Sequence, residues 1–235
     1  MQLFFNTEIT NQTKQVTFDK TESKHIVRVL RKKEGDTIFI TNGKGQLFSS
    51  QITIANDKRC LVTISKVKNF KKHWNYYLHI AIAPTKLNER FEWFIEKATE
   101  IGVDEITPII CDHSERKVLK TNRMEKIIHS AAKQSLKYHF PKLNEPISFK
   151  AFINSTFENQ LFIAHCENSN KKSLKSLLKP TESATILIGP EGDFSSKEIE
   201  QSLVHNFIPV SLGESRLRTE TAGIVAVHSV AFVNE

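Results

Sequence analysis

The segment Thr185–Glu200, TILIGPEGDFSSKEIE, restricts the possible folds more than any other part of this chain. Its first four residues form a mostly apolar run, which is typical of a central strand in a parallel sheet. Pro190 keeps Gly189 out of the helical region, so the chain turns directly after this strand. Ser195 and Glu198 have the spacing of a capping box, which predicts the start of a helix. The segment therefore predicts a strand, a tight loop at its carboxyl end, and a helix.

The residues from Tyr77 onward repeat this alternation of short apolar runs and helical patterns. We expect strands in residues 77–83, 105–111, 160–166, 184–189 and 207–213. Strands that alternate with helices indicate a mostly parallel sheet with helices on both faces. The predicted fold class of this part of the chain is α/β.

The helical patterns between these strands each have an apolar stripe. Gly102 is a predicted C-cap, Asn122 with Glu125 forms a predicted capping box, and Thr219 or Thr221 is expected to cap the last helix. Each of four predicted helices has its own expected buried face. The first has Phe91, Phe94, Ile95, Ala98 and Ile101, and the second has Met124, Ile127, Ile128, Ala131 and Ser135. The third has Ile199 and Leu203, and the last has Ala222, Val225, Ala226, Ser229 and Val233.

The first 70 or so residues have the period-2 pattern of β-strands instead. Apolar and polar residues alternate on both sides of Asn42-Gly43-Lys44-Gly45, which predicts a hairpin. The pattern recurs at Cys60, Val62, Ile64 and Val67, with a slip before the last of these. One helix is expected near Ile26, Val29 and Leu30. We predict a small β-barrel domain with one helix in residues 1–70, a linker near 66–77, and an α/β domain in 71–235.

The bulk composition excludes several classes of protein. Apolar residues make up 39% of the chain and charged residues 25%, which are ordinary values for a folded domain. No apolar run approaches the roughly 20 residues that a membrane-spanning helix needs, and the first residues do not resemble a signal peptide. Cys60, Cys111 and Cys166 form no CxxC pair, and the histidines have no metal-ligand spacing. We therefore expect no metal, no membrane partner and a cytoplasmic location.

The net charge of +7 is concentrated at the amino end. Residues 1–68 contain 12 lysines and arginines against 6 acidic residues, whereas residues 69–235 contain 21 against 20. A basic segment joined to a nearly neutral body suggests a nucleic-acid partner. A lysine-rich surface that only aids solubility explains the charge equally well.

A second glycine loop, in Val210–Gly223, repeats the design of the first. Neither loop contains the glycine patterns of phosphate-binding loops, and the carboxylates of Glu191 and Asp193 would repel phosphate. A neutral or cationic ligand fits better, because glycines let the backbone approach a flat ring closely. Either loop alone could be an ordinary tight turn. Two such loops at one sheet edge indicate two walls of one pocket.

The two loops, LIGPEGDFSSKEI (187–199) and LGESRLRTETA (212–222), closely resemble the two C-terminal motifs of the ribosomal RNA small-subunit methyltransferase E family. HIVRVLRKKEGD (25–36) and RFEWFIEKATEIGVDEITPI (90–109) are similar to other segments of that family, in the same order. SERKVLK (114–120) and AAKQSLKYHFP (131–141) resemble its central motifs. The resemblance extends over nearly the whole chain.

The resemblance implies a PUA-like RNA-binding β-barrel domain followed by a SPOUT methyltransferase domain, whose C-terminal loops form a trefoil knot. It implies a homodimer that uses S-adenosyl-L-methionine (SAM) and no metal, and whose partner is the 16S rRNA of the 30S subunit. Members of the family act in ribosome biogenesis, where they methylate N3 of uridine 1498, in standard rRNA numbering. The alternatives are a SPOUT enzyme acting on another RNA nucleotide and a non-catalytic RNA-binding adaptor.

Three positions depart from the family pattern. Asp193 stands where a further glycine is usual, although Asp tolerates a positive φ better than most residues. Leu136-Lys137 replaces a usual Gly-Arg, which keeps the charge but removes a flexible backbone position. The chain begins Gln2-Leu3, without the arginine that many members carry near the N-terminus.

The resemblance assigns roles to individual residues. The residues expected around SAM are Ile188, Gly189, Pro190, Glu191, Gly192, Leu212, Gly213, Leu217, Arg218, Thr219, Thr221 and Ala222. Arg218 and Arg116 are candidates for holding the uracil anion or a phosphate, Glu220 for accepting the proton or orienting Arg218, and Gln134 for contacting a uracil edge. The RNA-contacting candidates are Lys24, His25, Arg28, Arg31, Lys32 and Lys33, of which Lys24, Arg28 and Arg31 are expected on one helical face.

Each assignment has a structural alternative. Glu220 is equally consistent with an acidic residue favoured at a helix start. Gln134 can be a plain surface residue, and Arg116 can be a phosphate contact without a catalytic role. The basic cluster can be a charged face that is only solvated.

Overall fold

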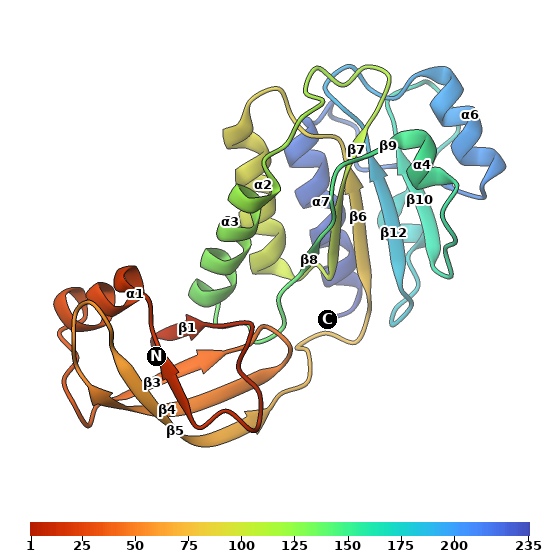
Figure 1. Cartoon of the computed structure of the whole chain (residues 1–235). Helices are drawn as coiled ribbons and strands as arrows, with labels where there is room; N and C mark the ends of the chain where they lie inside the picture. Colours follow the sequence, from red (N-terminus) through yellow and green to blue (C-terminus); the bar gives the residue numbers. More distant parts are fainter. The chain divides into compact units, whose positions relative to one another are not determined.

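The computed structural model describes residues 1–235 and contains two compact units (Figure 1). The first consists of Met1–His73 together with Ala132–Phe140, and the second of Trp74–Ala131 together with Pro141–Glu235. The division into domains at residues 70 and 71 stays a prediction. No helix combines the length and the apolar composition that a bilayer crossing requires.

The first unit contains a five-stranded sheet. Its strands, in the order β1-β3-β4-β5-β2, are β1 (Leu3–Phe5), β3 (Thr37–Thr41), β4 (Gln46–Ile54), β5 (Leu61–Asn69) and β2 (Gln15–Thr17). The predicted hairpin is confirmed, since β3 and β4 pair antiparallel around residues 42–45. The predicted slip is also confirmed: Lys66 pairs with Ser49 and Ile64 with Ser50, so Ser65 is an extra residue that forms a bulge.

The helical segment of this unit differs from the sequence prediction. It consists of α1 (Lys20–Lys24) and a π-helical turn, η1 (His25–Val29), in which the Leu30 N–H donates to the His25 carbonyl oxygen. The wider turn rotates Val29 out to solvent, whereas Ile26 is fully buried and Leu30 packs partly against the core. The predicted face of Ile26, Val29 and Leu30 is therefore wrong.

The segment 132–140 completes the first unit. The Gly45 N–H donates to the Tyr138 carbonyl oxygen over 2.8 Å, and the Lys133 ammonium lies 3.2 Å from a carboxylate oxygen of Glu22. Leu136 has a φ of 54°, the left-handed conformation that favours glycine. The family's usual glycine at this position thus fits the backbone better than leucine does.

The second unit contains an eight-stranded parallel sheet with the order β11-β13-β10-β12-β6-β7-β8, and β9 also pairs with β7. All five predicted strands are confirmed as β6 (Leu78–Ile82), β7 (Glu105–Ile110), β10 (Gln160–Ala164), β12 (Ala184–Ile188) and β13 (Ile208–Ser211). The strands β8 (Lys142–Leu143), β9 (Ile147–Ser148) and β11 (Lys172–Ser173) are short additions.

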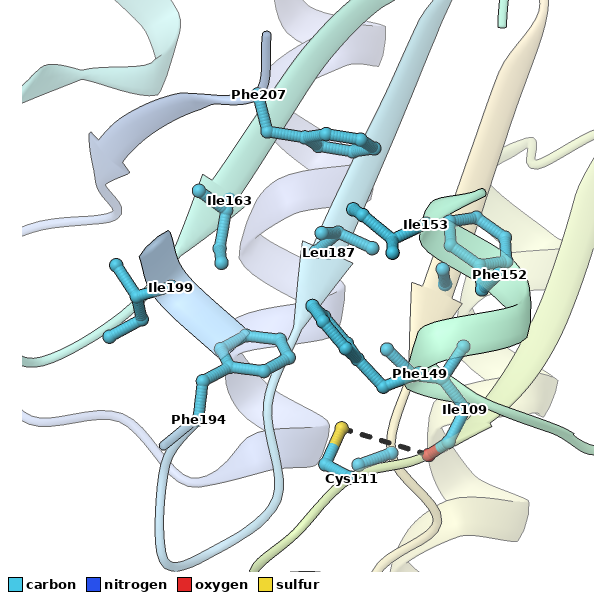
Figure 2. Packing of buried hydrophobic residues seen from close by; sticks show 12 residues of the cluster. Ile109, Cys111, Phe149, Phe152, Ile153, Ile163, Leu187, Phe194, Ile199 and Phe207 are labelled. Atoms are coloured by element: carbon cyan, nitrogen blue, oxygen red, sulfur yellow. Dashed lines mark hydrogen bonds between the residues drawn. The ribbon is translucent and has the colours of Figure 1, made fainter. Parts of the chain in front are cut away.

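Helices cover both faces of this sheet, as predicted (Figure 1). They are α2 (Asn88–Ile101), α3 (Thr121–Gln134), α4 (Phe149–Ile153), α5 (Leu174–Leu177), α6 (Ser196–Val204) and α7 (Thr219–Val233). Helices α2 and α7 pack on one face of the sheet. On the other face, Phe149 and Phe152 of α4 and Ile199 of α6 point toward Leu187 and the neighbouring strands (Figure 2).

The local helix signals have mixed outcomes. The capping box of Ser195 and Glu198 and the C-cap at Gly102 are confirmed. The predicted capping box of Asn122 and Glu125 is wrong, because α3 already begins at Thr121 and Asn122 lies inside its first turn. The last helix is capped by neither threonine: Arg218 is its N-cap, through its backbone carbonyl alone.

The buried faces are mostly as predicted for α2 and α3. For α6 and α7 they are as predicted only in part, at Ile199 and Ala226. Leu203 on α6 is 45% exposed. The buried residues in the middle of α7 are Gly223, Ala226, Val227 and Val230, and only Ala226 of these belongs to the predicted stripe. Because α7 is apolar on all sides, its sequence does not reveal which face is buried.

Gly223 allows α7 to approach α2 closely. A Cβ at this position would lie 2.6 Å from Cε2 of Phe94 and 2.9 Å from Cδ1 of Ile82, and both side chains are fully buried. Neither neighbour can move into solvent. Glycine is therefore required here, although alanine is the better helix former.

We expect Gly223→Ala to lower the free energy of unfolding by about 1–3 kcal/mol, since overpacking a dense core outweighs the gain in helix propensity. Chemical denaturation of the purified protein measures this. Ser229→Ala on the same helix is the control, because its side chain is only half buried. Equal or greater stability of Gly223→Ala would contradict the packing described here.

Candidate functional site

The carboxyl ends of β13, β10 and β12 lie side by side in the sheet and open onto two cavities. The first cavity has a volume of about 400 Å³ and is lined by Arg90, Ala164, Cys166, Ile188, Gly189, Pro190, Glu191, Asp193, Arg216, Leu217, Arg218, Thr219 and Ala222. The second cavity has a volume of about 590 Å³ and is lined by residues 164–166, Lys171, Asp193, residues 210–217 and Ala222.

The two cavities adjoin each other. Six residues line both of them: Ala164, Cys166, Asp193, Arg216, Leu217 and Ala222. They come from the loops after three neighbouring strands and from the start of α7. The two glycine loops therefore line two adjoining cavities at one sheet edge.

The first glycine loop has little room for larger side chains. A Cβ on Gly189 would lie 3.0 Å from the ring of Phe194, which is buried in the core. Asp193 has a φ of 64°, and its carboxylate accepts hydrogen bonds from the Phe194 N–H and, over 2.7 Å, from the Cys166 N–H. Asp193 therefore takes the conformation expected of the family's glycine and also ties this loop to the end of β10.

Glu191 connects the same loop to the segment before α2. One of its carboxylate oxygens accepts a hydrogen bond from the Lys86 N–H over 2.9 Å. The other, Oε2, is buried and has no hydrogen-bond partner in the protein. Buried carboxylate oxygens usually have partners, so this atom lacks the partner that its burial calls for, in a residue that lines the first cavity.

Arg116 contacts the same segment from another side. Its guanidinium donates hydrogen bonds to the Thr85 carbonyl oxygen over 3.1 Å and to the Lys86 carbonyl oxygen over 2.6 Å. Arg116 does not line either cavity. It therefore holds the loop that precedes α2, together with Glu191.

The second glycine loop leads into α7. Gly213 has a φ of 140°, and no heavy atom lies within 4 Å of the position its Cβ would take. Arg218 and Thr219 line the first cavity, whereas Glu220 lies behind its wall. Glu220 is only 6% exposed, its Oε1 is 3.8 Å from Nε of Arg90, and its Oε2 has no hydrogen-bond partner.

The structure brings most of the predicted cofactor residues together. Ten of the twelve line one or both cavities: Ile188, Gly189, Pro190, Glu191, Leu212, Gly213, Leu217, Arg218, Thr219 and Ala222. Gly192 and Thr221 line neither. The Gly192 carbonyl oxygen instead lies 3.1 Å from Nδ1 of His113. Gln134 is exposed at the end of α3, in the first unit.

The predicted cofactor residues leave out several that line the cavities. Lys171, Asp193, Val210, Ser211 and residues 214–216 are among them, as are residues 164–166 and Arg90. Residues 164–166 follow β10, and the rule that ligands bind at carboxyl ends of parallel strands could have identified them. Arg90 has no such local signal, because it lies in the first turn of α2 and follows no strand directly.

The predicted RNA-contacting residues all lie in the first unit. Lys24, Arg28, Arg31 and Lys33 are exposed, and His25 and Lys32 are half buried. The proposed common helical face is wrong for Arg31, which follows η1 with a φ of 56°. Arg28 donates a 2.8 Å hydrogen bond to Asp57, and this bond holds the pKa of the Asp57 carboxyl below its usual value.

A different cavity, of about 640 Å³, lies near the amino ends of β6, β7 and β12. Its polar groups pair with one another: Asn144 donates to both Glu105 and Thr107, and His79 contacts Thr107 over 2.7 Å. Burial raises the pKa of Glu105, but hydrogen bonds from Tyr77 and Asn144 outweigh it and lower the pKa to about 2. This cavity is larger than either of the other two alone, yet its buried polar groups are already satisfied.

No group of three or more His, Cys, Asp or Glu side chains is arranged to hold a metal ion. The groups that line the first cavity are the two glycine loops, the carboxylates of Glu191 and Asp193, and the arginines at positions 90, 216 and 218. The second cavity adds Glu214, His165 and Lys171.

Comparisons with known protein families match most of the chain. Residues 50–231 match the family described as an RNA methyltransferase domain, and residues 18–65 match the RNA methyltransferase PUA domain. The ribosomal RNA small subunit methyltransferase E of Buchnera aphidicola is 32% identical over 91% of this chain and 86% of its own length. That of Bacillus subtilis is 29% identical over 91% of this chain and 88% of its own length.

Solved structures agree over the full length of the chain. A probable rRNA-methyltransferase from Porphyromonas gingivalis is 41% identical, with a TM-score of 0.93 over 100% of this chain and 98% of its own. A Legionella pneumophila protein, solved in complex with the bound cofactor SAM, is 27% identical, with a TM-score of 0.89 over 99% of this chain and 97% of its own.

Proposed function

This chain belongs to the ribosomal RNA small subunit methyltransferase E family, and we propose that it methylates N3 of a uridine in small-subunit rRNA with SAM as the methyl donor. The observation that carries the proposal is the pair of glycine loops, 189–193 and 212–218, which line two adjoining cavities at the carboxyl ends of β12 and β13. Open α/β sheets bind their ligands at this edge.

The chemistry of the lining fits SAM. The two cavities have the size of ordinary cofactor sites. Asp193 and Glu191 line the first cavity, and their carboxylates suit a ligand with a sulfonium and an ammonium group. We propose that residues 188–191, 212–213, 217–219 and Ala222 hold the cofactor, largely through their backbone.

When bound, SAM would supply an electrophilic methyl group to N3, and the electron pair of the broken carbon–sulfur bond would stay on sulfur. N3 would give up its proton to solvent or to a base, for which Glu220 is the candidate from the sequence. The protein's part is to align the two reactants and to stabilise the negative charge that develops on uracil. Arg218 lines the first cavity and presents an exposed guanidinium for this purpose. Glu220 has Arg90 as its ion-pair partner, which argues against a role in orienting Arg218.

The proposed target is uridine 1498 of 16S rRNA, which would place the protein in the cytoplasm with the 30S subunit. Mass spectrometry of rRNA fragments from the source organism, with and without the gene, tests this directly. We expect 3-methyluridine at that position only when the gene is present. A methyl group at a different nucleotide would identify another RNA target, and an unchanged methylation pattern would favour a non-catalytic adaptor.

We propose that the basic cluster of the first unit, Lys24, His25, Arg28, Arg31, Lys32 and Lys33, contacts rRNA phosphates. Its exposure and charge support this role, and phosphate contacts position RNA without reading its sequence. Arg28 must then exchange Asp57 for a phosphate.

The double substitution Arg28→Glu and Arg31→Glu should weaken rRNA binding and reduce the slope of log affinity against log salt by about one for each phosphate that is no longer neutralised. Filter binding at several salt concentrations measures both. Lys175→Glu with Lys197→Glu is the matched control, since these lysines are exposed and lie outside the cluster. A salt slope unchanged from that of the natural protein would reject the assignment.

We further propose that the protein is a homodimer and that its C-terminal loops form a trefoil knot. Helix α7 supports the dimer, because it is apolar on all sides and Phe232, near its end, is 63% exposed. Light scattering should give twice the chain mass of 26.9 kDa.

A further inference from the structure

We propose that Arg90, positioned by Glu220, is a catalytic residue that stabilises the uracil anion during methyl transfer. This inference rests on the proposed function and deepens it. The first turns of α2 and α7 bring the two side chains together, although they lie 130 positions apart in the sequence.

Glu220 provides the first observation. Its side chain is almost completely buried, and Oε2 has no hydrogen-bond partner. A buried carboxylate is unfavourable unless a cation lies close to it. Arg90 is the cation that the structure provides, with Nε 3.8 Å from Oε1.

Arg90 provides the second observation. The 3.8 Å between its Nε and Oε1 of Glu220 is short enough for an ion pair but too long for a hydrogen bond. The guanidinium of Arg90 makes no hydrogen bond to any other group of the protein, so all five of its N–H donors are available. The residue lines the first cavity and is about one-third exposed. Glu220 thus holds Arg90 in place without occupying its donors.

The position of Arg90 suits an anion that forms at the methyl acceptor. Arg90 and Arg218 line the same cavity as Gly189 and Glu191, where we place the methyl donor. Uracil that loses its N3 proton carries negative charge on O2 and O4, and a preorganised donor stabilises such charge strongly. Arg116 then acts indirectly: it holds the Thr85 and Lys86 carbonyl oxygens just before α2.

The test compares Arg90→Ala, Arg90→Lys and the natural protein in single-turnover methylation of 30S subunits, with SAM affinity measured by calorimetry. We expect Arg90→Ala to lower the rate about 100-fold, with the Kd for SAM changed less than about threefold. Arg90→Lys should recover part of the rate because it keeps the charge. If Arg90→Ala does not fold, Arg90→Gln replaces it as the variant that lacks the charge, and its rate and SAM affinity are compared with those of Arg90→Lys.

The pH dependence separates a catalytic role from a structural one. Without Arg90 the N3 proton leaves less readily, so the deficit of Arg90→Ala should shrink as pH rises from 7 to 9.5. The charged or titratable side chains that line the cavity are Cys166, Glu191, Asp193, Arg216 and Arg218. They are present in both proteins, so the ratio of the two rates reports the removal of Arg90 itself.

The role of Glu220 is tested by a double-mutant cycle. Glu220→Gln should lower the rate less than Arg90→Ala does, and the double variant should be no slower than Arg90→Ala alone. Additive effects of the two substitutions would show that Glu220 acts independently and would overturn the positioning role.

Three results would overturn the role of Arg90: a natural rate for Arg90→Ala, a deficit independent of pH, or a raised KM for the 30S subunit with an unchanged kcat. The last would identify a phosphate contact instead. If the natural protein itself fails to methylate 30S subunits, the proposed function fails, which is a different outcome from any of these.

Discussion

Replacing Arg218 with alanine is expected to lower methyl-transfer turnover about 100-fold, as removal of a donor to a developing negative charge does in other enzymes. Arg218 lines the first cavity, and its side chain takes no part in capping α7. The backbone carbonyl of Arg218 caps the helix by accepting a 2.8 Å hydrogen bond from the Ala222 N–H. This hydrogen bond remains in the alanine variant, because the substitution changes only the side chain. The variant should therefore fold normally.

The measurement is a comparison of kcat with SAM affinity. We expect the Kd for SAM to change less than threefold or so, because the interaction that is removed is one that strengthens in the transition state. Arg123→Ala is the control: this arginine pairs with Glu92 at a distance of 2.7 Å and does not line the first cavity. Equal decreases of turnover and SAM affinity in Arg218→Ala would show that Arg218 only binds the cofactor.

Replacing Glu191 with glutamine is expected to weaken SAM binding about 10- to 100-fold. The substitution preserves shape and still allows an oxygen to accept the Lys86 N–H. It removes the negative charge beside the buried, unpartnered oxygen, and hydrogen bonds that involve a charged group contribute about 1.5–3 kcal/mol. Calorimetric titration with SAM measures the effect.

The matched control is Glu200→Gln, which makes the same change of charge on the exposed side of α6. We expect its SAM affinity to equal that of the natural protein. A Glu191→Gln variant with natural affinity would mean that this carboxylate only fastens the loop to Lys86, and that the positive charge of the ligand lies elsewhere.

The sequence predicted the parts of this fold that depend on local patterns. The apolar run before Gly189 is β12, Ser195 and Glu198 form the expected capping box, and Asp193 takes a positive φ. In each case the residues that determine the conformation are neighbours in the chain. Their effect does not depend on the rest of the fold.

The predictions that failed depend on longer-range packing. The π-helical turn at His25–Val29 shifts Val29 outward, because burial of Ile26 and Leu30 outweighs regular α-helical spacing. In α7 the apolar residues are spread around the helix axis, so only the close contact of Gly223 with Phe94 reveals which face is buried.

The candidate site was predicted only where its residues follow a strand. Gly189 and Gly213 end strands, and the carboxyl-end rule locates them. Arg90 became apparent only when the structure brought α2 beside the start of α7. The resemblance of its motif assigns Arg116 to the uracil anion or a phosphate, whereas its hydrogen bonds place it against the Thr85–Lys86 backbone.

The most direct test of the central claim is a crystal structure of the protein with SAM. The account predicts that the adenosyl and sulfonium groups lie between residues 189–193 and 212–218, with the methyl group facing Arg218. Ligand density at another place on the protein, or none at saturating SAM, would contradict it.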